Sequence, residues 1–138
     1  MMKCLSCTVE EVLTLSAKNG KSTIEWYIDA SFAVHPDFKS HTGASMMFEG
    51  GKECVINNSA KQKLNTGSST TSELVGVDHV LPLVIWVPLF LKAQVHSINE
   101  NIVYQDNQSA ILLEKMVGRA AAKGLGHLTC DILWLPTR

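Results

Sequence analysis

Apolar and polar residues alternate in the stretch that begins at Thr23. Every second position there is apolar, at Ile24, Trp26 and Ile28. A period of two is typical of a β-strand that buries one face, so the pattern predicts a strand. Asp29 falls on the opposite parity and should point away from the apolar face. We therefore expect a carboxylate on the side of this strand that does not join the core.

Two more strands are expected after the first. His35-Pro36-Asp37 is a turn signal. The run from Gly43 to Phe48 then predicts a second strand, and Gly50-Gly51 separates it from a third strand between Glu53 and Asn57. Because short turns join antiparallel neighbours, these three strands should form a meander.

A long helix is predicted next. After the polar loop from Asn65 to Ser69, Thr70 stands three residues before Glu73, which is the spacing of a capping box. One face of this helix would be apolar and would carry Leu74, Val77 and Leu81. Pro82 and Pro88 each lack an amide donor and cost about 3 kcal/mol in a straight helix interior. We expect a kink or a break at the prolines.

The remaining sequence predicts further strands and one more helix. Asn99–Asn101 is read as a turn, Ile102–Tyr104 as a short buried strand, Asn107–Met116 as a helix and Ile132–Leu135 as a last strand. An antiparallel meander joined to strands that are connected through helices gives a mixed sheet with helices on its faces. The predicted fold class is therefore α/β.

Length and charge limit the alternatives. The 138 residues are 46% hydrophobic, which is enough for one core, and the formal charge of −1 indicates no global affinity for nucleic acid or membrane. We assign residues 1–22 to a leading segment and 23–138 to a single domain. The start lacks a signal-peptide core, and the most apolar stretch, Leu81–Leu91, is too short to span a membrane. An intracellular location, cytoplasmic or nuclear, with no membrane partner is expected.

The cysteines offer a competing interpretation. Cys4 and Cys7 have the spacing of half a metal knuckle, whereas Cys54 and Cys130 supply no second pair. A small metal-binding or redox module built on the first two residues is therefore kept as a separate hypothesis. Ordinary reduced cysteines fit the spacing better.

Three acidic residues stand at junctions between the predicted elements: Asp29, Glu73 and Asp106. Magnesium prefers carboxylate oxygens, and two such ions about 4 Å apart can activate water and stabilise the leaving oxygen of a phosphodiester. Taken singly, Glu73 could complete its capping box and Asp106 could cap the next helix. Asp29 favours a metal site, because a carboxylate within an apolar strand is costly unless it is paired.

Four motifs occur in order along most of the chain. They are Trp26–Asp37 with Ser40-His41-Thr42-Gly43, then Ser59-Ala60-Lys61-Gln62-Lys63, then Ser68–Leu74, and finally Tyr104–Ile111. Together they resemble the ribonuclease H domain of copia-type LTR retrotransposon Gag-Pol polyproteins. The first motif resembles the opening of that domain, and the last three resemble its Ser-Lys-Lys-Gln, Ser-Ser-x-Glu-Ala-Glu and Asp-Asn-x-Ser-Ala-Ile segments.

The resemblance implies a ribonuclease H-like fold and hydrolysis of the RNA strand of an RNA/DNA hybrid. Asp29, Glu73 and Asp106 would then be catalytic and would hold two Mg²⁺ or Mn²⁺ ions. Contacts to nucleic acid are expected from Lys61, Lys63, Ser69 and Asn107, with the RNA strand recognised by its 2′-hydroxyls. A solvated turn is the alternative for the two lysines.

The chain also departs from the family. Residues 120–126 replace a basic segment that phosphates would favour, and Ile132–Thr137 resembles a strand that comes later in the family. The family's last helix, with a fourth acidic ligand, would follow Arg138, so we expect that helix to be missing. Asp131 is the nearest candidate for a further metal ligand, although its position matches no ligand of the family. A catalytically inactive retroelement remnant, binding at most nucleic acid or protein, is therefore the alternative function.

Overall fold

The computed structural model describes residues 23–49, 53–108, 111 and 131–134. Its elements in chain order are β1 (Thr23–Ser31), β2 (His41–Phe48), β3 (Ile56–Lys61), α2 (Ser69–Ala93), β4 (Glu100–Gln105) and β5 (Asp131–Trp134). The predicted leading segment, residues 1–22, lies outside the described residues, as does most of the predicted helix after Asn107.

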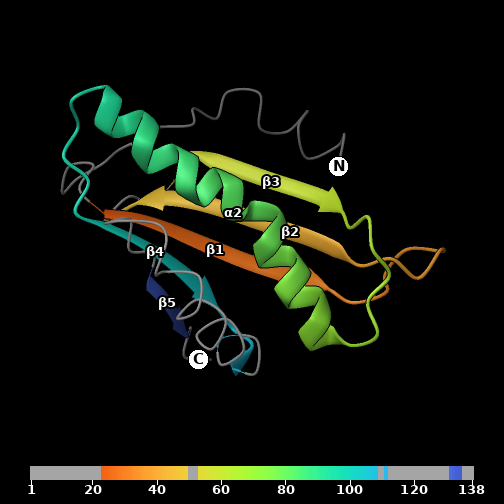
Figure 1. The fold of residues 1–138 in the computed structure, drawn as a ribbon. Coiled ribbons are helices and arrows are strands. Elements are labelled where there is room, and N and C mark those ends of the chain that lie inside the picture. Colours follow the sequence, from red (N-terminus) through yellow and green to blue (C-terminus); the bar gives the residue numbers. More distant parts are fainter. Residues whose placement is uncertain (1–22, 50–52, 109–110, 112–130, 135–138) are drawn as a thin grey trace, which may run out of the picture.

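The described strands form one mixed sheet in the order β3-β2-β1-β4-β5, with α2 across one of its faces (Figure 1). β1 pairs antiparallel with β2, and β2 pairs antiparallel with β3, which confirms the predicted meander. β4 runs parallel to both β1 and β5. The predicted α/β class, a ribonuclease H-like mixed sheet made of a three-stranded meander plus parallel strands, is therefore confirmed.

Backbone pairing moves several strand boundaries from their predicted places. The third strand runs over Ile56–Lys61 instead of 53–57, because its partner β2 extends back to His41 and the register pairs that residue with Lys61. β3 is polar apart from its first residue and Ala60, so its sequence shows no apolar period that could reveal it. The predicted turn at Asn99–Asn101 is also wrong, since Asn101 is a buried residue of β4.

The core lies between α2 and the inward face of the sheet. Ile24, Trp26 and Ile28 are 0–3% exposed, which confirms the period-two prediction for β1. The helix packs on them through Val77, Val80, Val84, Val87 and Leu91. The predicted helix face is wrong at Leu81, which is 37% exposed.

Gly76 lies where α2 passes close to β1 and β2. An added Cβ at this position would lie 3.4 Å from the Ala30 Cβ and 3.5 Å from Thr42. These are ordinary van der Waals distances, so a methyl group would fill the space between the helix and the sheet. The helix therefore approaches the sheet closely at a residue that the apolar pattern does not mark.

α2 continues through both prolines, so of the predicted kink or break the break does not occur. Pro88 cannot donate to the carbonyl of Val84, four residues before it. The side chain of Asn101 supplies the missing donor, with Nδ2 donating to that carbonyl at 2.9 Å. Its Oδ1 accepts a hydrogen bond from Trp26 Nε1 at 3.1 Å. The buried side-chain amide of Asn101 thus bonds both to the carbonyl of Val84, which Pro88 leaves without a helical donor, and to the indole N–H of Trp26.

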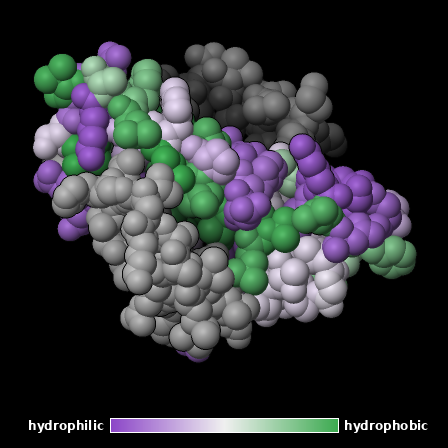
Figure 2. Space-filling model, viewed as in Figure 1, coloured by the Kyte–Doolittle hydropathy of each residue, from purple (hydrophilic) through white to green (hydrophobic). Residues whose placement is uncertain are grey.

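α2 is also long and apolar enough to cross a membrane by length and composition. Core helices pass the same test, so these two properties alone are weak evidence for a membrane span. Leu81, Trp86, Leu89 and Phe90 remain exposed on its outer side. Figure 2 shows hydrophobic residues along this helix, whereas hydrophilic residues gather at the end of the molecule where the loops after β1 and β3 lie.

Candidate metal centre

Asp29, Glu73 and Asp106 come together at one end of the sheet. One carboxylate oxygen from each lies within 4.8 Å of those of the other two. Asp29 is near the end of β1 and Asp106 directly follows β4. Because these two strands are parallel neighbours, their carboxyl ends meet at the same edge of the sheet. α2 begins above this edge and adds Glu73.

The start of α2 places Glu73 against the sheet. Ser68 is the N-cap, and its Oγ accepts a hydrogen bond from the Thr71 amide at 3.1 Å. The predicted capping box between Thr70 and Glu73 is therefore wrong. Glu73 lies in the second turn, on the same side of the helix as Val77, and is only 6% exposed. Its carboxylate is free of any capping role and faces the other two acids.

The site is electrostatically unfavourable without a cation. Burial raises the pKa of Glu73 to about 7, with a further contribution from the negative charge of Asp29 and a smaller one from Asp106. Hydrogen bonds from the Ala30 amide and from Gln105 act in the opposite direction. Asp29 and Asp106 are exposed, so only one of the three carboxylates is both buried and crowded by charge. Bringing a positive charge to this edge would relieve the repulsion.

The segment after β4 holds Asp106 through the side chain of the preceding residue. Gln105 is fully buried, and its Oε1 accepts hydrogen bonds from the amides of Asp106 at 2.8 Å and Asn107 at 3.3 Å. The next described bond joins the Ile111 amide to the Asn107 carbonyl at 3.1 Å, which is the spacing of a helical turn. Asn107, rather than Asp106, therefore holds the N-cap position, and Asp106 is not required as a cap.

A second buried glutamine ties α2 to the meander beside the site. Gln62 is 2% exposed, and its Nε2 donates to Thr42 Oγ1 at 3.0 Å and to the carbonyl of Ser72 at 2.8 Å. The backbone amide of Gln62 donates to the carbonyl of Ser40 at 2.9 Å. These bonds join β2, the end of β3 and the residue before Glu73, so the first turns of α2 are fixed relative to the sheet.

The donor set fits a hard divalent cation. Three carboxylates supplied by different elements match the preference of Mg²⁺ or Mn²⁺ for oxygen ligands, with room left for water and substrate oxygens. The described residues contain no other group of three histidine, cysteine or acidic side chains close enough to share an ion. The role of these three acids as metal ligands stays a prediction.

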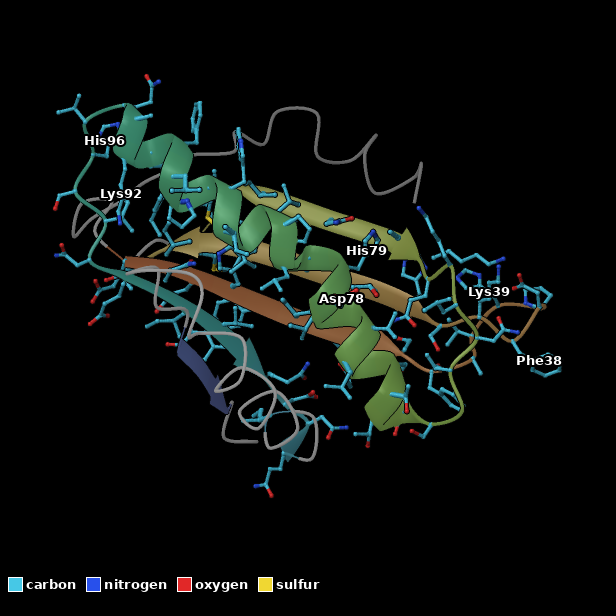
Figure 3. All side chains as sticks on the ribbon, viewed as in Figure 1. Phe38, Lys39, Asp78, His79, Lys92 and His96 are labelled. Carbon is cyan, nitrogen blue, oxygen red and sulfur yellow. The ribbon has the colours of Figure 1, made fainter. Side chains whose placement is uncertain are left out.

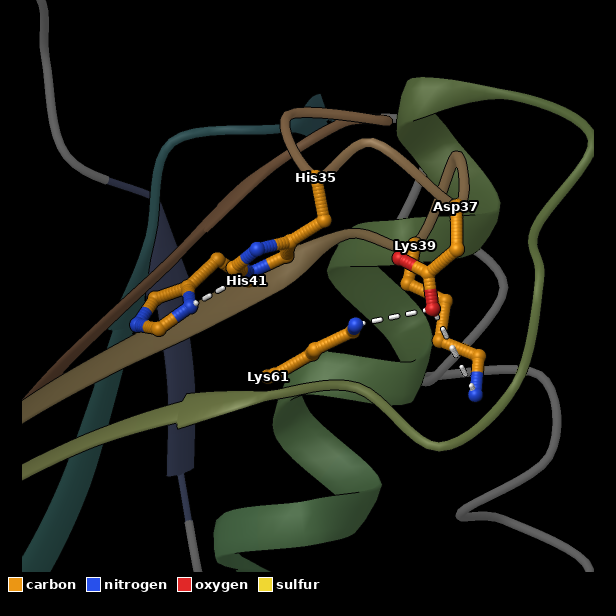
Figure 4. Close-up of polar contacts among 5 residues, drawn as sticks. All are labelled: His35, Asp37, Lys39, His41 and Lys61. Atoms are coloured by element: carbon orange, nitrogen blue, oxygen red, sulfur yellow. Dashed lines mark hydrogen bonds and ion pairs between the residues drawn. The ribbon is translucent and has the colours of Figure 1, made fainter.

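Basic residues lie on the loop between β1 and β2 and at the end of β3 (Figure 4), which is the end of the sheet where β1 ends. Lys61, predicted to contact phosphate, pairs with Asp37 at 2.8 Å, and Lys39 reaches the same carboxylate oxygen at 3.9 Å. The two ammonium groups lower the pKa of Asp37. Figure 3 shows Lys39 beside Phe38 at the tip of the loop between β1 and β2. The negative charge of Asp37 therefore offsets part of the positive charge that Lys61 would offer to a polyanion.

Two histidines continue this polar surface. His35 Nε2 and His41 Nδ1 are 3.0 Å apart, and His41 Nε2 lies 2.8 Å from Ser59 Oγ. His41 pairs with Ser31 across the β1–β2 ladder, two positions beyond Asp29. The parity of the strands therefore places His41 on the same face of the sheet as Asp29.

The remaining predicted site residues are placed less closely. Lys63 is exposed after β3, and Ser69 is exposed as the first residue of α2. Asn107 lies next to Asp106 and is half-buried. Asp131 opens β5, opposite Ile102 of β4, but its side chain is outside the description. Cys4, Cys7 and Cys130 lie outside the described residues, so the cysteine hypothesis stays a prediction.

Gln105 is a member of the site that the sequence pattern does not single out, since it stands there only within the Tyr104–Ile111 motif. Its signal was its parity: Asn101, Val103 and Gln105 fall on the inward face of β4, and a polar residue there must find buried partners.

Two solved structures are among those similar to the chain. The chain is similar to the N-terminal RNase H domain of Rv2228c from Mycobacterium tuberculosis, a fusion with maltose-binding protein, with 14% identity, 83% of each chain covered and a TM-score of 0.46. It is also similar to the foamy viral protease-reverse transcriptase in complex with dsDNA, with 13% identity, 91% of this chain and 87% of that chain covered, and a TM-score of 0.48. No protein-family model and no curated protein matches the chain. Because both TM-scores are below 0.5, the fold class rests on the strand order and register.

Proposed function

We propose that this chain is a metal-dependent nuclease domain of the ribonuclease H type, from a copia-type retrotransposon, that hydrolyses the RNA strand of RNA/DNA hybrids. The observation that carries the proposal is the convergence of Asp29, Glu73 and Asp106, whose carboxylate oxygens lie within 4.8 Å of one another. No pairing with a basic side chain accounts for these three acids among the described contacts. The motifs that contain them are those on which the sequence resembles that family.

The chemistry follows from the donor set. Mg²⁺ ions bound there would activate water and stabilise the leaving oxygen of a phosphodiester. Asp29 and Asp106 are exposed and open to a substrate, whereas Glu73 is buried and anchors the site to α2. The protein's part is to hold the three carboxylates at fixed positions and to receive the sugar-phosphate backbone beside them.

The surface beside the acids suits a polynucleotide only in part. Lys39, Lys61 and Lys63 lie on the loops and strand end next to the site, and lysines that contact phosphates position a backbone without reading its sequence. The pairing of Lys61 with Asp37 weakens this contribution. Discrimination of the RNA strand from the DNA strand would depend on the 2′-hydroxyl.

Metal-dependent cleavage tests the proposal. A hybrid with labelled RNA is incubated with the chain over a titration of Mg²⁺ or Mn²⁺, and Asp29→Asn is compared with Asp78→Asn. Asp78 is an exposed acid of α2 outside the cluster, so it controls for loss of one negative charge. We expect cleavage that requires the metal, disappears in Asp29→Asn and persists in Asp78→Asn. A folded chain that binds the hybrid without cutting it would instead be the inactive remnant.

A further inference from the structure

Gln105 is buried between the elements that supply two of the three acids. Its side chain is fully inaccessible to solvent although it belongs to the last residue of a strand. Nε2 donates to Glu73 Oε2 at 3.3 Å, and Oε1 accepts from the amides of Asp106 and Asn107. A single amide group therefore bridges the second turn of α2 and the backbone that carries Asp106.

The orientation of this amide is determined by its neighbours. The backbone amides of Asp106 and Asn107 can only donate, so the group facing them must be the oxygen. The nitrogen is then turned toward Glu73, where it meets a carboxylate that can accept. Reversing the amide would set donors against donors on one side and an oxygen against a carboxylate on the other. All the bonds agree on one arrangement, which fixes both acids at once.

A neutral bridge has an advantage over a charged one at this place. A lysine or arginine would pair with Glu73 and compete with a cation for the carboxylate, and an acid would add a fourth negative charge. Glutamine orients the carboxylate while leaving its charge available. Residues that hydrogen-bond to metal ligands in this way typically change metal affinity by about 10- to 100-fold when they are replaced.

We propose that Gln105 is a positioning residue that sets the placement of Glu73 relative to Asp106 for binding of a divalent cation. This inference rests on the proposed function, since it assumes that the acids hold a metal. Gln105 itself contacts no substrate. Its contribution is the hydrogen-bonded bridge, and it should appear as metal affinity rather than only as stability.

The test is Mn²⁺ binding to the purified chain, measured by isothermal titration calorimetry, with Gln105→Met as the variant. Methionine has a similar size and no amide. Asn101→Leu is the matched control, because Asn101 is also a buried side-chain amide of β4 that bonds to α2, but at the carbonyl of Val84, eleven residues beyond Glu73. We expect Gln105→Met to weaken Mn²⁺ binding by about 10-fold or more and Asn101→Leu to leave it close to wild type. Urea unfolding establishes that each variant is folded.

A second readout separates positioning from a general structural role. At saturating Mn²⁺, the electron paramagnetic resonance spectrum of the bound ion should differ between wild type and Gln105→Met, because a displaced carboxylate changes the ligand field. If Gln105→Met does not fold, Gln105→Asn replaces it: its amide is one methylene shorter, cannot reach both partners, and should show the same loss.

The outcomes are distinct. Unchanged Mn²⁺ affinity and spectrum in Gln105→Met would overturn the role of Gln105, as would an equal loss in Asn101→Leu. A wild-type chain that binds no Mn²⁺ would contradict both the metal centre and this inference. A wild-type chain that binds Mn²⁺ tightly, loses it in Gln105→Met and yet cuts no hybrid would support the positioning role and contradict only the proposed nuclease activity.

Discussion

Replacing Glu73 with glutamine should remove a pH dependence from the stability of the metal-free chain. The pKa of Glu73 is raised from 4.5 to about 7. The folded state therefore holds a proton at this carboxyl more tightly than the unfolded state does. The resulting stabilisation is fully present below about pH 4.5 and is lost as the pH rises through about 7. The side-chain amide of the Glu73→Gln variant cannot ionise, so this loss should be absent.

The size of the effect follows from the two pKa values. The difference between 4.5 and about 7 corresponds to about 3 kcal/mol at about 1.4 kcal/mol per pH unit. Glu73 is 6% exposed, so solvent screening removes only part of this value. We expect the wild-type chain to lose about 2–3 kcal/mol of unfolding free energy between about pH 5 and pH 8 relative to Glu73→Gln.

Urea unfolding in the presence of a chelator measures the difference. With a urea slope of about 1–3 kcal/mol per molar, the unfolding midpoint of wild type should fall by about 1 M or more relative to the variant. Asp78→Asn removes an exposed charge from the same helix, and its unfolding midpoint should depend on pH as that of wild type does. Parallel pH dependences of the unfolding midpoint for wild type and Glu73→Gln would show that the Glu73 carboxyl is not the source of the effect. Adding Mg²⁺ at about pH 8 should restore wild-type stability, because cations bind the ionised carboxylates.

Two other predictions concern the helix prolines and the basic surface. Asn101→Leu should lower the free energy of unfolding by about 2–4 kcal/mol, because it leaves buried Trp26 Nε1 and the carbonyl of Val84 without partners. Adding Pro88→Ala supplies an amide to that carbonyl and should recover part of the loss in urea unfolding. An Asn101→Leu variant as stable as wild type would contradict this role of Asn101. Asp37→Asn should tighten hybrid binding and steepen its salt dependence by about one phosphate contact, because it releases Lys61. Fluorescence anisotropy at several salt concentrations measures both quantities. An unchanged dependence of affinity on salt would show that Lys61 does not contact the phosphate backbone of the hybrid.

Parity and turn signals were sufficient to predict most of the sheet. The period-two pattern from Ile24 to Ile28 placed β1 with its inward face buried and Asp29 outside, and the structure agrees. β3 was misplaced because it is polar, and only its pairing with β2 defines its limits. Local pattern predicts strands that bury side chains, but it does not find a strand that is held mainly by backbone hydrogen bonds.

Two features of α2 depend on contacts with residues outside the helix and so cannot be predicted from its own sequence pattern. Of the kink or break expected at the prolines, the break does not occur, and at Pro88 the side chain of Asn101, thirteen residues further on, donates to the carbonyl that the proline leaves unpaired. Likewise, the close approach of α2 to β1 and β2 at Gly76 is not marked by the apolar pattern of the helix. Both are tertiary contacts between distant parts of the chain, so the sequence of the helix does not reveal them.

For the site, the acids were easier to predict than their support. Asp29, Glu73 and Asp106 stand at element junctions in the sequence, and the structure brings them together. The capping box assigned to Glu73 was wrong because Ser68 caps the helix two residues earlier than predicted. Gln105 carries no chemical signature of its own, and its bridging role depends on the distance between α2 and the end of β4.

Asp29, Glu73 and Asp106 are proposed to form a metal-dependent centre that cuts RNA within a hybrid. The most direct measurement uses one hybrid labelled separately on its RNA and DNA strands, incubated with Mg²⁺ and either wild type or Asp106→Asn. We predict cleavage of the RNA strand alone by wild type and none by Asp106→Asn. A chain shown to be folded that cuts neither strand, or that cuts equally well without Asp106, would contradict the account.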